Sequence, residues 1–122
     1  MAAASIEEIQ GFLLDVKMAI VRKKISLVRR KENLECLAKH GWSIDDILFG
    51  ISALTYRNYI SGPEEDDDPR FNGDIWKFGH IIDGTECYIK IKLVVVKDGE
   101  LLVCLSFHEP IYEMRYPYKG PP

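Results

Sequence analysis

The sequence predicts a single-domain α+β protein whose N-terminal helices pack on one face of an antiparallel β-sheet. Apolar residues recur at helical spacing through residues 5–61. Residues 74–119 instead hold runs rich in β-branched and aromatic residues, separated by Asp-Gly turns. A chain of 122 residues suits one domain, with an acidic loop at 62–73 joining the helical half to the sheet.

Three helices are expected in the first half. Ser5 and Glu8 have the spacing of a capping box, which starts a helix running to about residue 21. A second helix covers 31–39 and stops at Gly41, and Ser43 caps the start of a third. The residues expected to face the core from these two helices are Leu34, Leu37, Ile44, Ile47, Leu48, Ile51 and Leu54.

The second half predicts a meander of three strands. The expected strands cover residues 74–82, 86–96 and 101–108, with short edge segments at 24–28 and 114–119. A two-residue turn at Asp83-Gly84 places Phe78 opposite Ile89 on the face toward the helices. It also leaves Gly79 beside Tyr88, with open space there.

The second turn is assigned by keeping apolar residues on one face. A three-residue turn over 97–99 achieves this. The apolar pairs that result are Ile89–Phe107, Ile91–Leu105, Leu93–Val103 and Val95–Leu101. The other face pairs Tyr88–His108, Lys90–Ser106 and Lys92–Cys104.

The face away from the helices is therefore expected to be cationic. It gathers Lys77, Tyr88, Lys90, Lys92, Ser106 and His108. Lys77 and Lys90 lie opposite each other, and like charges in that position destabilise a strand pair. Two explanations stay open: the lysines splay apart in solvent, or an anionic ligand such as a phosphate neutralises them. RNA offers phosphates, bases for stacking and a 2′-hydroxyl, so it suits such a face.

Three short runs carry a family resemblance: 74–77 (Asp-Ile-Trp-Lys), 87–91 (Cys-Tyr-Ile-Lys-Ile) and 103–108 (Val-Cys-Leu-Ser-Phe-His). In order and spacing they resemble the C-terminal half of MqsR-type toxins, which belong to the RelE-like bacterial toxin endoribonucleases. The resemblance covers roughly residues 42–109. It implies a compact RelE-like α+β ribonuclease that needs no metal or cofactor. Such a toxin cuts mRNA, free or on the ribosome, and is held inactive by a cognate antitoxin encoded nearby.

The resemblance also assigns roles. Tyr88 matches a functional tyrosine of the family, Lys77 falls at a functional glutamine and His108 at a functional lysine, while a further functional lysine falls near Ser61. Cleavage by 2′-hydroxyl attack needs a base, an acid and cations, and His108 alone on this face has an ordinary pKa near neutrality. The expected catalytic residues are His108, Tyr88 and Lys77. The expected substrate-binding residues are Lys90, Lys92 and Ser106.

Composition and charge limit the function classes that remain possible. The net charge of −3 argues against a general nucleic-acid coat, although charge is clustered, with basic residues at 22–31 and five acids at 64–68. A non-catalytic adaptor or inactive toxin relative would use those two clusters to bind a protein. A metal hydrolase built on 64–68 lacks histidine partners. Three cysteines without a CxxC pattern predict buried free thiols. No membrane span or signal peptide is expected, which predicts a cytoplasmic protein.

Overall fold

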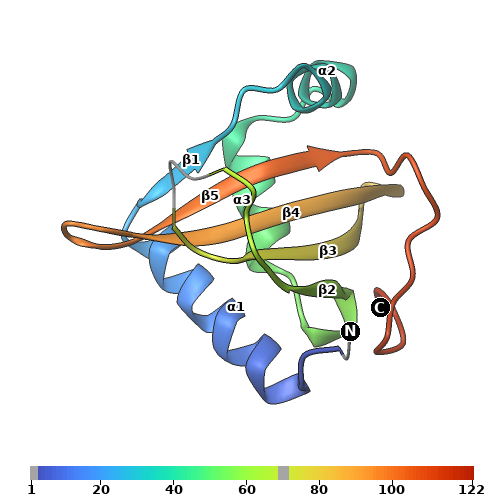
Figure 1. The fold of residues 1–122 in the computed structure, drawn as a ribbon. Coiled ribbons are helices and arrows are strands. Elements are labelled where there is room, and N and C mark those ends of the chain that lie inside the picture. Colours follow the sequence, from blue (N-terminus) through green and yellow to red (C-terminus); the bar gives the residue numbers. More distant parts are fainter. Residues whose placement is uncertain (1–2, 69–71) are drawn as a thin grey trace.

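The computed structural model describes residues 3–68 and 72–122, and this part of the chain forms three α-helices and a five-stranded sheet. Helices α1 (Ile6–Val21) and α3 (Ile44–Ser52) lie against one face of the sheet, while α2 (Lys31–His40) lies at the edge beside strand β5 (Figure 1). The predicted class, α+β with N-terminal helices, is confirmed. Capping boxes at Ser5 and Ser43 start α1 and α3 as their sequences indicate.

The sheet has the strand order β1-β5-β4-β3-β2, in which only the β1–β5 pair is parallel. Its strands are β1 (Ile25–Leu27), β2 (Tyr59–Glu64), β3 (Ile75–Ile82), β4 (Thr85–Val96) and β5 (Gly99–His108). The short edge strand expected near residues 24–28 is confirmed as β1. A single 3₁₀ turn, η1 (Tyr56–Asn58), leads into β2.

Strand β2 corrects the prediction that residues 59–61 end the helical half and that a loop begins at Gly62. The segment instead pairs with β3, with register shifts that let it pass along the sheet edge. Proline is tolerated there because an edge strand has one side that needs no N–H donor. Tyr59 anchors the strand, since its buried ring packs among Trp76 and Phe78 and its hydroxyl donates to the Gly62 carbonyl at 2.6 Å.

The register of the central strands is confirmed where the candidate site lies and wrong near the second turn. Strands β3 and β4 pair as predicted throughout, and β4 and β5 pair as predicted from Tyr88–His108 to Lys90–Ser106. The second turn has two residues, not three, because Val96 pairs with Gly99. A bulge at Leu105 takes up the extra residue, so the ends of the strands still align.

The bulge moves Leu105 from the predicted helix-side core to a second apolar cluster on the other face. That cluster contains Ile75, Val94, Val103 and Leu105. The predicted pairs Ile91–Leu105, Leu93–Val103, Val95–Leu101 and Lys92–Cys104 are therefore not formed. Cys104 and Leu102 instead pack in the main core, opposite Ile91 and Leu93. The main core lies between the sheet and the helices α1 and α3.

Helix α2 faces inward only partly as predicted: Leu37 packs against the main core, but the other inward positions differ. Leu34 is 43% exposed, whereas Asn33 and Cys36 are buried. In α3, Ile47 and Ile51 are buried as expected, but Ile44 is exposed.

Asn33 explains why α2 lies as it does. Its amide Nδ2 donates to the carbonyls of Val28 at 2.9 Å and Leu105 at 3.0 Å, and its Oδ1 accepts from the Phe107 N–H at 2.9 Å. Beyond Val28, strand β1 has ended, so the asparagine side chain takes its place along the edge of β5. This holds the strand end that carries His108.

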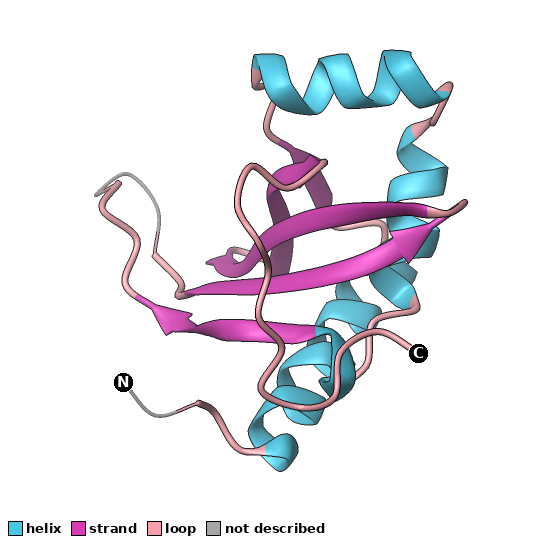
Figure 2. Cartoon of the chain, turned by 90° about the vertical axis from the view of Figure 1, so that its right-hand side faces the viewer, coloured by secondary structure: helices cyan, strands magenta, loops and turns pink. Residues whose placement is uncertain are grey.

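The C-terminal segment forms no strand over 114–119, contrary to expectation. It runs as a coil past the open face of the sheet (Figure 2). Tyr116 and Met114 fill the space above Gly79 that was predicted to be open, and the Tyr118 hydroxyl donates to the Ala4 carbonyl at 2.6 Å. The segment is thus anchored to the sheet and to the start of the chain.

Candidate functional site

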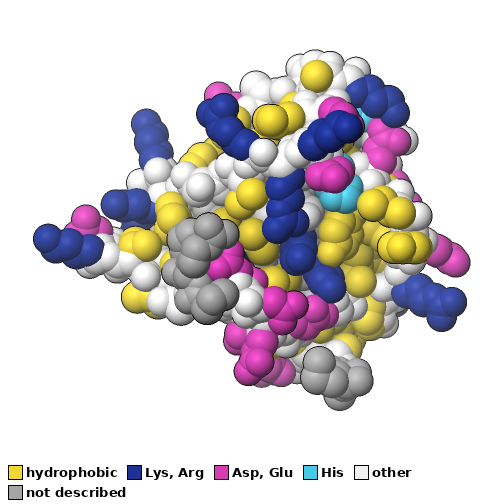
Figure 3. All heavy atoms as spheres, turned by 45° about the horizontal axis from the view of Figure 1, so that its top comes forward, with side chains coloured by type: hydrophobic (Ala, Val, Ile, Leu, Met, Phe, Trp, Pro, Cys, Tyr) yellow, Lys and Arg dark blue, Asp and Glu magenta, His cyan; other side chains and the backbone are white. Residues whose placement is uncertain are grey.

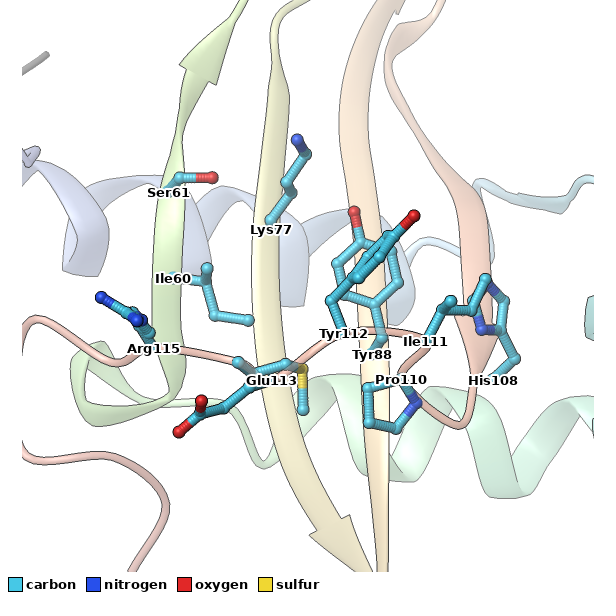
Figure 4. Close-up of a pocket in the computed structure, with 11 residues that line it drawn as sticks. Ile60, Ser61, Lys77, Tyr88, His108, Pro110, Ile111, Tyr112, Glu113 and Arg115 are labelled. Carbon is cyan, nitrogen blue, oxygen red and sulfur yellow. The ribbon is translucent and has the colours of Figure 1, made fainter.

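A pocket of about 520 Å³ contains the three residues predicted to be catalytic (Figure 4). Lys77, Tyr88 and His108 come from β3, β4 and β5, so neighbouring strands place them side by side. The remaining walls come from Ile60 and Ser61 of β2 and from the C-terminal residues 110–115. Ser61, which falls near a functional position of the resembled family, therefore lies in the same pocket.

One ring nitrogen of His108 is used in a hydrogen bond to the backbone. Its Nδ1 lies 2.8 Å from the backbone carbonyl of Glu109, and a carbonyl can only accept, so Nδ1 carries the hydrogen. In the neutral ring, Nε2 then holds the free lone pair, as a general base requires. The imidazole lies 5.6 Å from the Tyr88 ring, measured between ring centres and tilted by 50°.

Tyr88 is half-buried in the same pocket. Burial raises the pKa of its hydroxyl, and the nearby positive charge of Lys77 only partly offsets that effect. The hydroxyl therefore stays protonated at neutral pH and is a proton donor rather than a base.

Lys77 is already balanced by a carboxylate. Its ammonium lies 3.1 Å from Glu64, which also accepts a hydrogen bond from the Ser61 hydroxyl at 2.9 Å. Burial alone would raise the pKa of Glu64, but the hydrogen bonds from Lys77 and Ser61 outweigh it and hold that pKa below its usual value. Glu64 is thus ionised at neutral pH.

The acidic segment 64–68 lies on the lysine-bearing face, which corrects the prediction of a solvated loop. Alternate side chains of an extended chain point the same way. Glu65 and Asp67 are accordingly exposed, while Asp66 forms an ion pair with Lys92. The hydrogen bond from Lys92, joined by one from the Asp68 N–H, lowers the pKa of Asp66. Through Glu64 and Asp66, the segment pairs with Lys77 and Lys92 of the sheet. Residues 69–71 of the predicted acidic loop lie outside the described residues.

Lys90 has neither a hydrogen bond nor an ion pair with any residue in 3–68 or 72–122. It lies opposite Lys77 in the register, and burial lowers its pKa, as do the positive charges of Arg30 and Lys77. Figure 3 shows basic side chains in a line between apolar groups, with acidic side chains below them. A half-buried ammonium beside two other cations favours an anion as its partner.

The other two predicted substrate-binding residues are not accessible. Lys92 is 1% exposed and paired with Asp66, and Ser106 is buried. We therefore remove both from the candidate site. What the sequence reasoning missed is the C-terminal wall and Arg30. The apolar and aromatic pair Ile111-Tyr112, directly after the last strand, was the available signal.

Other chemistry-bearing side chains have structural partners. His40, expected to cap α2, lies 2.9 Å from the Glu109 carboxylate and stacks on Trp42. The three cysteines are buried and free, as predicted, and burial raises the pKa of Cys87 and Cys104 to about 12. Within the described residues, no group of three or more His, Cys, Asp or Glu side chains is placed to hold a metal.

Comparisons with family models, with curated proteins and with solved structures found no match for this chain. In the described part of the chain, no helix combines the length and apolar character needed to cross a bilayer.

Proposed function

We propose that this chain is a metal-independent endoribonuclease, the toxin of a type II toxin–antitoxin pair, which cuts mRNA by 2′-hydroxyl attack on the adjacent phosphate. The observation that supports it best is the combination of two features on one sheet face. His108, Tyr88 and Lys77 share a pocket, and Lys90, which has no ion-pair partner in the described part of the chain, lies opposite Lys77 in the register. The motif order of the sequence points to the same function independently of the pocket.

The pocket residues supply each step of the reaction. Nε2 of His108 takes the 2′-hydroxyl proton, and the 2′-oxygen then forms a bond to phosphorus. The bond from phosphorus to the 5′-oxygen breaks, and that oxygen leaves with the electron pair and takes the proton of the Tyr88 hydroxyl. The products are a 2′,3′-cyclic phosphate and a 5′-hydroxyl. Proton exchange with solvent restores His108 and Tyr88.

Cationic side chains stabilise the negative charge that develops on the pentacoordinate phosphate. Lys90 forms no ion pair with a carboxylate among the described residues, so a phosphate there gains a partner without breaking an ion pair of Lys90. Lys77 adds positive potential while held in place by Glu64. Preorganised charges of this kind stabilise the transition state because they need little rearrangement during the reaction.

The test is cleavage of an end-labelled single-stranded RNA in the presence of a chelator. We expect products ending in a 2′,3′-cyclic phosphate and no cleavage when the attacking 2′-hydroxyl is replaced by hydrogen. The His108→Ala variant should lose at least 100-fold in rate, since a general base contributes about 10²–10⁴-fold. His80→Ala is the control, because that imidazole lies outside the pocket and is close to Asn58 rather than to the residues around His108. Equal rates for His108→Ala and wild type would refute the assignment.

Binding is tested separately with Lys90→Ala. It should weaken RNA binding and flatten its dependence on salt, because each phosphate contact releases counterions. Lys17→Ala, an exposed lysine on α1, should change neither. In cells, the wild-type protein should slow growth when expressed without its neighbouring gene, and His108→Ala should be tolerated at equal soluble level.

The second candidate is a non-catalytic adaptor or inactive toxin relative. It is favoured by one observation: the acidic segment already balances Lys77 and Lys92, which reduces the free positive charge on this face. Stable binding of a protein partner, with no RNA cleavage by the wild type, would support this candidate.

A further inference from the structure

We propose that the pocket mouth is a nucleobase subsite, in which Tyr112 stacks on a base next to the phosphate that Lys90 binds. This rests on the proposed RNA function but adds a residue and a chemical class that the sequence motifs do not include. Tyr112 is 84% exposed, more than any other large apolar side chain in the described part of the chain. Its neighbour Ile111 is also exposed.

The exposure of Tyr112 is not that of a loose chain end. The segment that carries it is fixed on both sides. His108 and Glu109 before it are held by contacts to Tyr88, Lys39 and His40. After it, Tyr116 packs over Gly79 and Tyr118 bonds to Ala4. An aromatic ring presented to solvent from an anchored segment loses little conformational entropy when it binds a flat ligand.

The two sides of the pocket differ in chemistry in the way a nucleotide does. Most of the lining near Tyr112 is apolar, formed by Ile60, Pro110, Ile111 and Met114, and the charged residues Glu113 and Arg115 of the same C-terminal segment also line the pocket. Lys77 lines the opposite side, and Figure 4 shows its ammonium directed away from these walls. No ring contact joins Tyr112 to Tyr88 among the described residues, so their own stacking does not close the space between them. A base against the apolar wall and a phosphate toward the lysines would satisfy both sides.

A nucleotide fits this pocket better than a protein side chain does. A volume of about 520 Å³ lies within the range of ligand-sized sites, roughly 300–1,000 Å³. Stacking of a base on an exposed aromatic ring is the usual contact with single-stranded nucleic acid and is tolerant of sequence. Lys90 and Arg30 nearby add the cationic contact that a phosphate needs and that an apolar side chain does not.

The test uses a single-stranded oligonucleotide with 2′-fluoro sugars, which cannot undergo 2′-hydroxyl attack, and one 2-aminopurine, whose fluorescence falls on stacking. We expect wild type to quench the probe. Tyr112→Ala should bind about 5- to 100-fold more weakly and lose the quenching, with an unchanged salt dependence. Tyr112→Trp should restore both. Phe49→Ala is the matched control, since that ring is 79% exposed on α3 at the other face of the molecule.

The outcomes separate this inference from the proposed catalysis. If wild type cleaves RNA while Tyr112→Ala binds and quenches as wild type does, the subsite is wrong and the ribonuclease stands. If wild type binds and quenches but cleaves no RNA, the subsite stands and the ribonuclease fails. If Tyr112→Ala loses binding of a protein partner while wild type does not bind the probe, the mouth is a protein-docking surface and the inference is overturned.

Discussion

Replacing Asn33 with leucine should strongly destabilise the protein, because this one side chain satisfies three backbone groups. Leucine has a similar size but offers no hydrogen bonds, so three backbone groups lose their partner: the carbonyls of Val28 and Leu105 and the N–H of Phe107. The bond to Val28 is only partly buried, and water can replace it. The other two groups are buried, and each costs about 1–3 kcal/mol when left unpaired. The expected loss is therefore about 2–6 kcal/mol.

The assay is urea unfolding followed by circular dichroism, with the slope against urea unchanged if the fold is kept. Glu35→Ala is the control on the same helix, because its ion pair with Lys31 is exposed and contributes at most about 1 kcal/mol. A loss below 1 kcal/mol for Asn33→Leu would refute the claim that this side chain substitutes for an edge strand. Weaker RNA cleavage is expected as well, because the same bonds hold the strand end before His108.

Two further predictions concern the surroundings of the site. Gly79→Val should release the C-terminal segment, because a Cβ there would clash with the Tyr116 ring and the Met114 methyl group. Faster amide exchange over residues 110–118 checks this, and wild-type exchange rates would contradict it. Burial lowers the pKa of His80, so its neutral form is favoured in the folded state, and the unfolded chain takes up a proton first as the pH falls. The free energy of unfolding should therefore decrease as the pH drops below about 6.5 and level off once the folded ring also protonates. An NMR titration that gives His80 a pKa at or above its ordinary value would disprove this.

The strand register shows which strand pairs can be predicted from the sequence and which cannot. The Asp83-Gly84 turn has a strong local signal, and every pair that follows from it is formed. The turn near Asp98 was assigned by counting apolar pairs, which assumes that no residue is inserted in either strand. The bulge at Leu105 breaks that assumption and happens to preserve the pairing around His108. The site residues were therefore brought together correctly although the turn was wrong.

Helix α2 shows a different limit. Hydrophobic periodicity predicts that Leu34 and Leu37 face inward, yet Leu34 is exposed and Asn33 is buried, while Leu37 packs against the core. The difference arises because β5 extends beyond the end of β1, leaving backbone groups that need partners. Such a need appears only when the strand lengths and their order are known, and local sequence does not contain it.

For the facing lysines Lys77 and Lys90 the sequence leaves open solvation or an external anion, and the structure shows a third arrangement. The chain's own carboxylates act as the anions: Glu64 pairs with Lys77, and Asp66 with Lys92. Lys90 is left between them with a lowered pKa. A phosphate that binds Lys90 also approaches the negative charges of Glu64 and Asp66, so it gains less than three free lysines would provide. RNA binding under this proposal should release few counterions, and apolar stacking on Tyr112 must contribute a large share of the affinity.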